Sequence, residues 1–286
     1  NTSVEAAVIE TARGGILRRG LAADRADVAI VTNISPDHFG EYGIDDLDGL
    51  ADVKLSIAHL LDREGLLVLN ADDALLRAKC DVLRQRLGWQ PMLGWFARQY
   101  DHPALVQHRG RLGATSGVRA GHLWLSSGSR EHDLGAIIDM PLTVDGIATY
   151  NVENLAAAAL VATKLGVPPV NIAQVFAAFG RDLADNAGRL MRFDIGGVKI
   201  IVDYAHNPDG LRGVMRVAEQ LRAPQGRIGG RGRGRAEDLG ADAQLAQRAF
   251  ARRIAVGCRR DRIRPRQRLP HRLLRRLAGP ARHAGD

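Results

Sequence analysis

The sequence predicts an α/β fold built around a parallel β-sheet. A short apolar run rich in β-branched residues at 27–33 is typical of a strand that is buried on both faces, and the apolar run at 66–70 predicts another strand. Segments with helical spacing of apolar residues, at 46–61 and 72–87, follow these runs. An alternation of strands and helices is typical of a parallel sheet covered by helices.

The other expected elements extend this pattern in both directions. They are a strand at 4–10, a small β insertion of short strands within 91–144 (including 122–126 and 136–140), and helices at 150–165 and 169–179. The polar stretch 180–188 predicts a domain boundary. Beyond it, strands at 189–195 and 198–203 are expected, joined by a turn at Gly196 and Gly197. Asn207 and Pro208 then supply an N-cap and a first helical residue.

Length and composition favour a globular protein of two domains. The 286 residues are 45% apolar and 25% charged, which excludes a disordered, collagen-like or coiled-coil chain. The only cysteines, Cys80 and Cys258, lie far apart, which argues against a disulfide framework or a zinc site and fits a cytoplasmic location. We find no apolar run long enough to span a membrane and no signal peptide. Because the chain begins with Asn1, we expect an upstream part to be missing.

The basic excess of the chain is confined to its last 60 residues. Residues 227–286 hold 17 arginines and five acidic residues, so their formal net charge is +12. Because the net charge of the whole chain is +8, the first 226 residues have a net charge of −4. Three interpretations remain open for this Arg-rich tail: a shifted reading frame of a GC-rich gene, a disordered solvated tail, or a nucleic-acid-binding arm. The third is the weakest, because Phe250 is the only aromatic residue that could stack on bases.

Candidate metal ligands follow the first two predicted strands. In open α/β sheets, ligands bind outside the carboxyl ends of the strands. Glu10 closes the first predicted strand, His38 lies in the loop after the second, and Lys54 lies within the apolar arc of the next helix. If these three side chains converge, their donor set suits Mg²⁺ better than zinc. Taken singly, a solvated Glu, a turn His and a snorkelling Lys are the ordinary interpretations.

Two further clusters could contact a nucleotide. Residues 203–208, Asp-Tyr-Ala-His-Asn-Pro, end a strand and open a helix, whose N-terminus suits a phosphate or a nearby ribose. On the residues alone, a capped turn is the favoured interpretation. Asn151 and Asn154 share one helix face and could read an adenine edge, although helix capping is the safer interpretation of Asn151.

These segments, taken in chain order, resemble the ATP-dependent Mur ligase superfamily. Residues 10–20 (ETARGGILRRG) resemble the Mur-like half of cyanophycin synthetases in particular. The other matching segments are 33–38 (NISPDH), 53–57 (VKLSI), 70–73 (NADD), 150–154 (YNVEN) and 203–208 (DYAHNP). The resemblance covers residues 1–222.

The resemblance implies a ligase that uses ATP and Mg²⁺. Such a ligase transfers the γ-phosphate of ATP to a carboxylate, and an amine then attacks the acyl phosphate to form an amide. By carry-over, Glu10 and His38 hold Mg²⁺, and Lys54 is carbamylated and faces the metal. Asn151 and Asn154 contact the nucleotide, Arg189 the phosphates and Asp203 the ribose, while His206 and Asn207 shape the cleft, with His206 as a catalytic candidate.

The implied architecture has three parts. Residues 1–182 correspond to a P-loop-type Mur central domain truncated at its start, 183–226 to the beginning of a Rossmann-like C-terminal domain, and 227–286 to the Arg-rich tail. The family's phosphate loop ends in Gly-Lys-Thr or Gly-Lys-Ser, and no Gly-Lys pair occurs in this sequence. We therefore expect the chain alone not to turn over ATP.

The expected partners are a small or polymeric carboxylate and an amino acid. Addition of arginine to an aspartate side chain of a growing polymer is the leading hypothesis. Residues 35–42 depart from the cyanophycin synthetase pattern, so a Mur-type ligase for another amino acid is the second hypothesis. A nucleic-acid-binding protein that uses the tail and a non-catalytic remnant are the others. No membrane partner is expected, and the oligomeric state stays open.

Overall fold

The computed structural model describes residues 4–36, 40, 43–205, 207–222, 224 and 226–229. Its strands are β1 (Val28–Val31), β2 (Leu66–Asn70), β3 (Met92–Gln99), β4 (Ala114–Arg119), β5 (His122–Ser127), β6 (Arg130–Ala136), β7 (Met191–Ile195) and β8 (Val198–Val202). Its α-helices are α1 (Arg13–Arg19), α2 (Leu47–Leu55), α3 (Ala74–Leu87), α4 (Pro103–Arg109), α5 (Thr149–Lys164), α6 (Pro169–Ala178) and α7 (Pro208–Leu221). Short 3-10 helices are η1 (Ser56–Leu60), η2 (Ile137–Asp139) and η3 (Pro141–Thr143).

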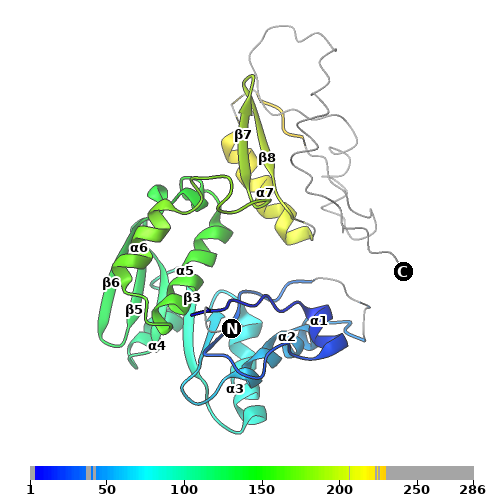
Figure 1. The fold of residues 1–286 in the computed structure, drawn as a ribbon, viewed down its shortest axis with the longest axis vertical. Coiled ribbons are helices and arrows are strands. Elements are labelled where there is room, and N and C mark those ends of the chain that lie inside the picture. The colour runs from blue at the N-terminus through cyan, green and yellow to red at the C-terminus, as the bar shows by residue number, and fades with distance from the viewer. Residues whose placement is uncertain are drawn as a thin grey trace.

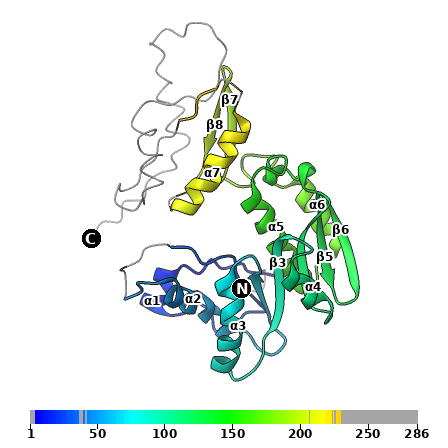
Figure 2. The same cartoon turned by 180° about the vertical axis from the view of Figure 1, so that it is seen from behind.

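The first six strands form one mainly parallel sheet, which confirms the predicted α/β class. The strand order is β1-β2-β3-β4-β5-β6, with parallel pairs from β1 to β4 and antiparallel pairs from β4 to β6. The short strands expected as a β insertion thus extend the same sheet. Strands β7 and β8 form a separate antiparallel hairpin that lies apart from the sheet in Figures 1 and 2.

Helices cover both faces of the sheet, as the fully apolar β2 requires. Leu66 and Val68 face a core that includes Leu155 and Leu160 of α5. Leu67 and Leu69 face the opposite core, which is built with α2, η1, α3 and α4. All five residues of β2 are buried, because β2 lies inside a three-layer arrangement. The carboxyl ends of β1 to β4 consequently share one edge of the sheet, which we call the carboxyl edge.

The hairpin β7–β8 and helix α7 pack on the chain just before and at the start of α5. Val144 and Ala148 form a small core with Leu190 and Val217, and Tyr150 packs against it. The hairpin turn is made by Gly196 and Gly197, both with positive φ, as the sequence predicts. This contact brings the start of the predicted C-terminal domain to the start of α5.

The predicted strand at 4–10 is wrong. Residues 4–12 carry no strand in the structure, and Val8 is 94% exposed. A β-prone run forms a strand only where a neighbouring strand and a buried face are supplied. Within the described residues, the edge strand β1 pairs with β2 alone, so this segment has no ladder to join.

The predicted strand at 136–140 is also wrong, because η2 occupies most of it. Gly135, the next-to-last residue of β6, has φ 109°, and the chain turns back so that the Ile137 amide donates to the Gly121 carbonyl at 2.9 Å. Met140 is still buried, but it reaches the core from a helical turn and not from a strand. Short apolar runs cannot be assigned to strand or helix by periodicity alone. The other predicted strands and helices are confirmed to within a few residues, whereas α1 and α4 were not predicted.

Gly117 on β4 offers a test of how closely β3 and β4 pack. A Cβ at this position would lie 2.7 Å from the Ala97 carbonyl oxygen and 2.9 Å from the Tyr100 amide nitrogen. Because both neighbours are backbone atoms, we expect Gly117→Ala to lower the free energy of unfolding by about 1–3 kcal/mol. Gly15→Ala in α1, where a Cβ meets nothing within 4 Å, is the matched control and should be neutral or slightly stabilising. Equal urea-unfolding midpoints for the two variants would contradict this packing.

Candidate functional site

At the carboxyl edge, two polar side chains form hydrogen bonds with the backbone of the loop after β1. Lys54 reaches back from α2, and its Nζ donates to the Asn33 carbonyl oxygen at 3.1 Å, just beyond β1. Asp73, beyond β2, accepts from the Ile34 amide at 2.7 Å. These two bonds fix the loop after β1 against α2 and the end of β2.

Asp73 also begins the next helix, which explains why the edge is rigid here. Its Oδ1 accepts from the Leu75 and Leu76 amides at 2.9 and 3.1 Å, so Asp73 is the N-cap of α3. The neighbouring Asn70 is buried, and its Oδ1 accepts from the Asp72 amide at 2.9 Å. The Asn-Ala-Asp-Asp segment thus works as a set of side-chain acceptors for backbone N–H groups.

The three predicted metal ligands have different outcomes. Lys54 is partly buried, and its Nζ contacts the Asn33 carbonyl oxygen just beyond β1. Glu10 is exposed in the irregular segment 4–12, and His38 lies outside the described residues. Across the ranges that the structure describes, no group of three or more His, Cys, Asp or Glu side chains could hold a metal ion. Because His38 is not among those residues, the predicted Mg²⁺ site stays a prediction.

Asn151 and Asn154 lie on one face near the start of α5, as the sequence predicts. Asn151 is buried, and its Nδ2 donates to the Leu142 carbonyl oxygen at 2.8 Å. Ala148 is the N-cap of α5, so the interpretation of Asn151 as a cap is wrong. Asn154 is exposed, and its Nδ2 lies 3.4 Å from the Asn151 Oδ1. Asn151 is thus committed to the fold, while Asn154 is accessible to a ligand.

The predicted nucleotide residues of the C-terminal part surround the end of β8. Asp203 accepts from the Leu190 and Ala205 amides at 2.8 and 2.7 Å, which ties β8 to the start of β7. Asn207 accepts from the Gly210 amide at 2.8 Å and caps α7, as predicted. The guanidinium of Arg189 lies 5.2 Å from the centre of the Tyr204 ring. His206 lies outside the described residues.

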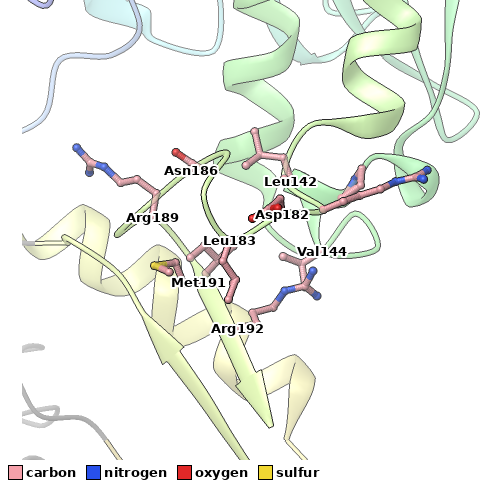
Figure 3. Close-up of a pocket in the computed structure, with 12 residues that line it drawn as sticks. Leu142, Val144, Asp182, Leu183, Asn186, Arg189, Met191 and Arg192 are labelled. Carbon is pink, nitrogen blue, oxygen red and sulfur yellow. The ribbon is translucent and has the colours of Figure 1, made fainter. Parts of the chain in front are cut away.

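A cavity of about 270 Å³ lies at the junction between η3, the linker after α6 and β7. Its lining includes Leu142, Asp182, Asn186, Arg189 and Arg192, among other residues. Figure 3 shows that the side chains of Arg189 and Arg192 leave this region in opposite directions. Of the predicted site residues that the structure describes, Arg189 alone lines the cavity, and Asn151 donates to the carbonyl of the lining residue Leu142.

Comparisons with known proteins show which family this chain resembles. Residues 1–87 match the Mur ligase middle domain. The resemblance to the Mur ligase superfamily is therefore confirmed. The chain is 36% identical over 253 residues to a cyanophycin synthetase of Synechocystis sp., covering 88% of this chain and 28% of that protein. It is 31% identical over 201 residues to a UDP-N-acetylmuramate–L-alanine ligase of Arthrobacter sp., covering 69% of this chain and 37% of that protein.

The chain spans little more than a quarter of the length of the cyanophycin synthetases that it matches. Among solved structures, the folylpolyglutamate synthetase complex with AMPPCP and folate has a TM-score of 0.50 and 21% identity, covering 78% of this chain and 49% of that one. This likeness supports the Mur ligase type of fold. No helix within the described ranges has the length and apolar character needed to cross a membrane.

One ion-paired cluster at the carboxyl edge was missed by the sequence analysis. The Arg98 Nε lies 3.6 Å from the Asp72 Oδ2 and 3.5 Å from the Glu153 Oε1. The cluster joins the ends of β2 and β3 to the start of α5. Since its members lie far apart in the chain and Arg98 stands within a strand, no local spacing could have indicated it.

Glu153 makes the stability of the protein depend on pH. Burial, together with the negative charge of Asp72, raises the pKa of Glu153 above its ordinary value of 4.5 despite the nearby Arg98. The folded state therefore holds the Glu153 proton more tightly than the unfolded state does, and stability falls as pH rises through the window above 4.5. We expect Glu153→Gln to remove this loss, so that the variant gains stability relative to the natural chain across that window. Parallel stability-versus-pH curves from urea unfolding would contradict this.

Proposed function

We propose that this chain is part of an ATP-dependent ligase that joins a carboxylate to an amine through an acyl phosphate. The observation that carries the proposal is that Lys54 and Asp73 lie at one carboxyl edge, to which the Arg98 ion pairs join the start of α5 that carries Asn154. Asp203 accepts from the Leu190 amide, and Leu190 packs in one core with Ala148 just before α5. Its likeness to cyanophycin synthetases and to a UDP-N-acetylmuramate–L-alanine ligase supports the same reaction class. The activity of the whole protein, of which this chain is a part, is included in this proposal.

The nucleotide would be held between the start of α5 and the end of β8. Asn154 presents an exposed amide that can donate to and accept from an adenine edge. Asp203 has unused acceptor positions for a ribose hydroxyl, although each oxygen already accepts one N–H. The Tyr150 hydroxyl is buried without a hydrogen-bond partner among the described residues. Burial, followed by the negative charge of Asp203, raises the pKa of Tyr150 above its ordinary value. An orphaned donor beside a carboxylate fits a site that a polar ligand completes.

Phosphoryl transfer depends mainly on positioning of the reactants and neutralisation of charge, and it requires little covalent catalysis by side chains. Phosphoryl transfer spreads negative charge over the transferred group, and fixed cations stabilise that charge. Arg189 supplies such a cation in this proposal, while Asn154 orients the nucleotide and the buried Asn151 beside it supports the Asn154 side chain. Asn207 shapes the cleft through its cap on α7, and His206 remains a catalytic candidate.

Mg²⁺ accompanies ATP in this proposal, with Glu10, His38 and a carbamylated Lys54 as its ligands. The position of Lys54 is compatible with this modification, because a carbamate keeps the N–H that can donate to the Asn33 carbonyl. Carbamylation also replaces a cation with an anion that can face a metal ion. Intact-protein mass spectrometry under CO₂ should show that the natural chain gains the mass of one CO₂. The Lys54→Met variant should not show this mass gain.

The proposed substrates are arginine and the aspartate side chains of a polymer. The higher identity to cyanophycin synthetase than to UDP-N-acetylmuramate–L-alanine ligase favours this pair. Because the chain contains no Gly-Lys pair to end a phosphate loop, we propose that it binds the nucleotide without turning it over by itself. Arginine-dependent ATP hydrolysis by the purified chain would contradict that part of the proposal.

Calorimetric titration of the chain with ATP tests the site. We expect saturable binding that Asn154→Ala weakens about tenfold, because one oriented amide contact to the base is lost. Asn171→Ala is the matched control, since Asn171 is an exposed asparagine on the neighbouring α6. Equal losses in the two variants, or no binding by the natural chain, would contradict the proposed site.

A further inference from the structure

Arg98 holds two carboxylates that come from different parts of the chain. Its backbone amide donates to the Asp72 Oδ2 at 2.7 Å, and its side-chain Nε lies 3.6 Å from the same oxygen. The same Nε lies 3.5 Å from the Glu153 Oε1. Arg98 thereby connects the loop after β2 to the start of α5.

The two partners of Arg98 differ in how firmly they are held. The backbone amide of Asp72 donates to the buried Asn70, and its neighbour Asp73 caps α3 and accepts from Ile34. The loop of Asp72 is therefore fixed to the sheet. Glu153 has only one ion pair among those found in the described residues, and that pair is with Arg98. Arg98 thus ties the start of α5 to an anchored point on the sheet.

The charge balance explains why this tie needs a cation. Asp72 and Glu153 each carry a negative charge near the same guanidinium, and both are mostly shielded from solvent, with side chains 21% and 26% exposed. Without the guanidinium, the two carboxylates would repel each other across a partly dry gap. The start of α5 would then be free to move away from the end of β2.

We propose that Arg98 is a positioning residue for Asn154, and that through Glu153 it fixes the amide that reads the base of the nucleotide. Asn154 follows Glu153 directly, and the one side-chain hydrogen bond found for it among the described residues is the long 3.4 Å bond to Asn151. Its orientation therefore depends on the backbone that Glu153 anchors. This inference rests on the proposed function, because it assumes that Asn154 contacts the base.

The test compares ATP with inorganic tripolyphosphate, which lacks the base, by calorimetric titration of the full chain. Arg98→Met should weaken ATP binding about tenfold, as Asn154→Ala does, and leave tripolyphosphate binding unchanged. In the Asn154→Ala background, Arg98→Met should add less than about twofold, because the two changes act on one contact. Arg98→Lys, which keeps the charge, should lose less than Arg98→Met does.

Two further variants make the result decisive. Arg84→Met removes an arginine of similar exposure on α3 and should leave ATP affinity unchanged. Glu153→Gln breaks the same tie from the other side and should give the same ATP-selective loss even if Arg98→Met folds poorly. ATP affinity that stays unchanged in Arg98→Met and Glu153→Gln, or a loss that persists fully in the Asn154→Ala background, overturns the inference alone. No ATP binding by the natural chain overturns the proposed function and the inference with it.

Discussion

Replacement of Asp73 by alanine is expected to lower the free energy of unfolding by about 2–4 kcal/mol. The variant loses the N-cap of α3, because Asp73 Oδ1 accepts from the Leu75 and Leu76 amides. It also leaves the part-buried Ile34 amide without the Oδ2 acceptor that lies 2.7 Å away. A lost cap costs about 1 kcal/mol, and an unsatisfied buried N–H adds about 1–3 kcal/mol. Urea unfolding followed by circular dichroism measures the sum.

The matched control for this variant is Asp81→Ala on the same helix. The Asp81 side chain is 86% exposed and lies 4.0 Å from Arg84, so its loss should change stability by less than about 0.5 kcal/mol. Asp73→Ala should also free the loop after β1, which carries the carbonyl that Lys54 contacts. Equal midpoints for the two variants would show that the Asp73 bonds contribute nothing to the fold.

Replacement of Lys79 by methionine is the second change with a large expected effect. Lys79 is 7% exposed, and its Nζ lies 2.5 Å from the Asp48 Oδ2 and 2.8 Å from the Asp52 Oδ1, between α2 and α3. Removing one partner of a buried ion pair strands the other charge. Because Asp48 is largely solvated and Asp52 retains Arg86, we expect a loss of about 2–3 kcal/mol, below the range for fully buried pairs.

The loss of stability at acidic pH, which we call the acid limb of the stability-versus-pH curve, gives an independent test of the Lys79–Asp52 pair. Burial would raise the pKa of Asp52, but hydrogen bonds from Lys79 and Arg86 outweigh it and lower the pKa below 3.8. The natural chain therefore keeps the stabilising charge above pH 3.8 and loses it as pH falls through the lowered pKa. Lys79→Met should flatten this acid limb, whereas Lys164→Met at the end of α5 should not. An unchanged acid limb in Lys79→Met would count against the pair.

The sequence predicted the elements whose signals are local. The buried run of β2, the Asn207 cap with Pro208, and the turn at Gly196 and Gly197 each depend on residues within one short segment. The strand at 4–10 failed because a strand also needs a neighbour, which no local pattern reports. The strand at 136–140 failed because a core position can be reached from a helical turn as well as from a strand.

The candidate site was predicted only in part, for a related reason. Residue types at strand ends indicated the carboxyl edge as the place of the site, but they did not predict the contact between Lys54 and the Asn33 carbonyl. They could not show that Asn151 would be committed to the Leu142 carbonyl, or that Arg98 would join Asp72 to Glu153. These contacts depend on how β3, η3 and α5 pack, which is decided by the tertiary structure. His38 and His206 lie outside the described residues, so their predicted roles stay predictions.

Photocrosslinking with 8-azido-ATP, followed by peptide mass spectrometry, tests the central claim most directly. The label carries its reactive group on the base, so it marks the residues that surround the adenine. Our account predicts labelled peptides from the start of α5, around 149–154, and from the linker at 186–190. Excess ATP that is present during irradiation should prevent this labelling. Labelling confined to residues 227–286, or to the surface between α2 and α3, would contradict a nucleotide site at the carboxyl edge.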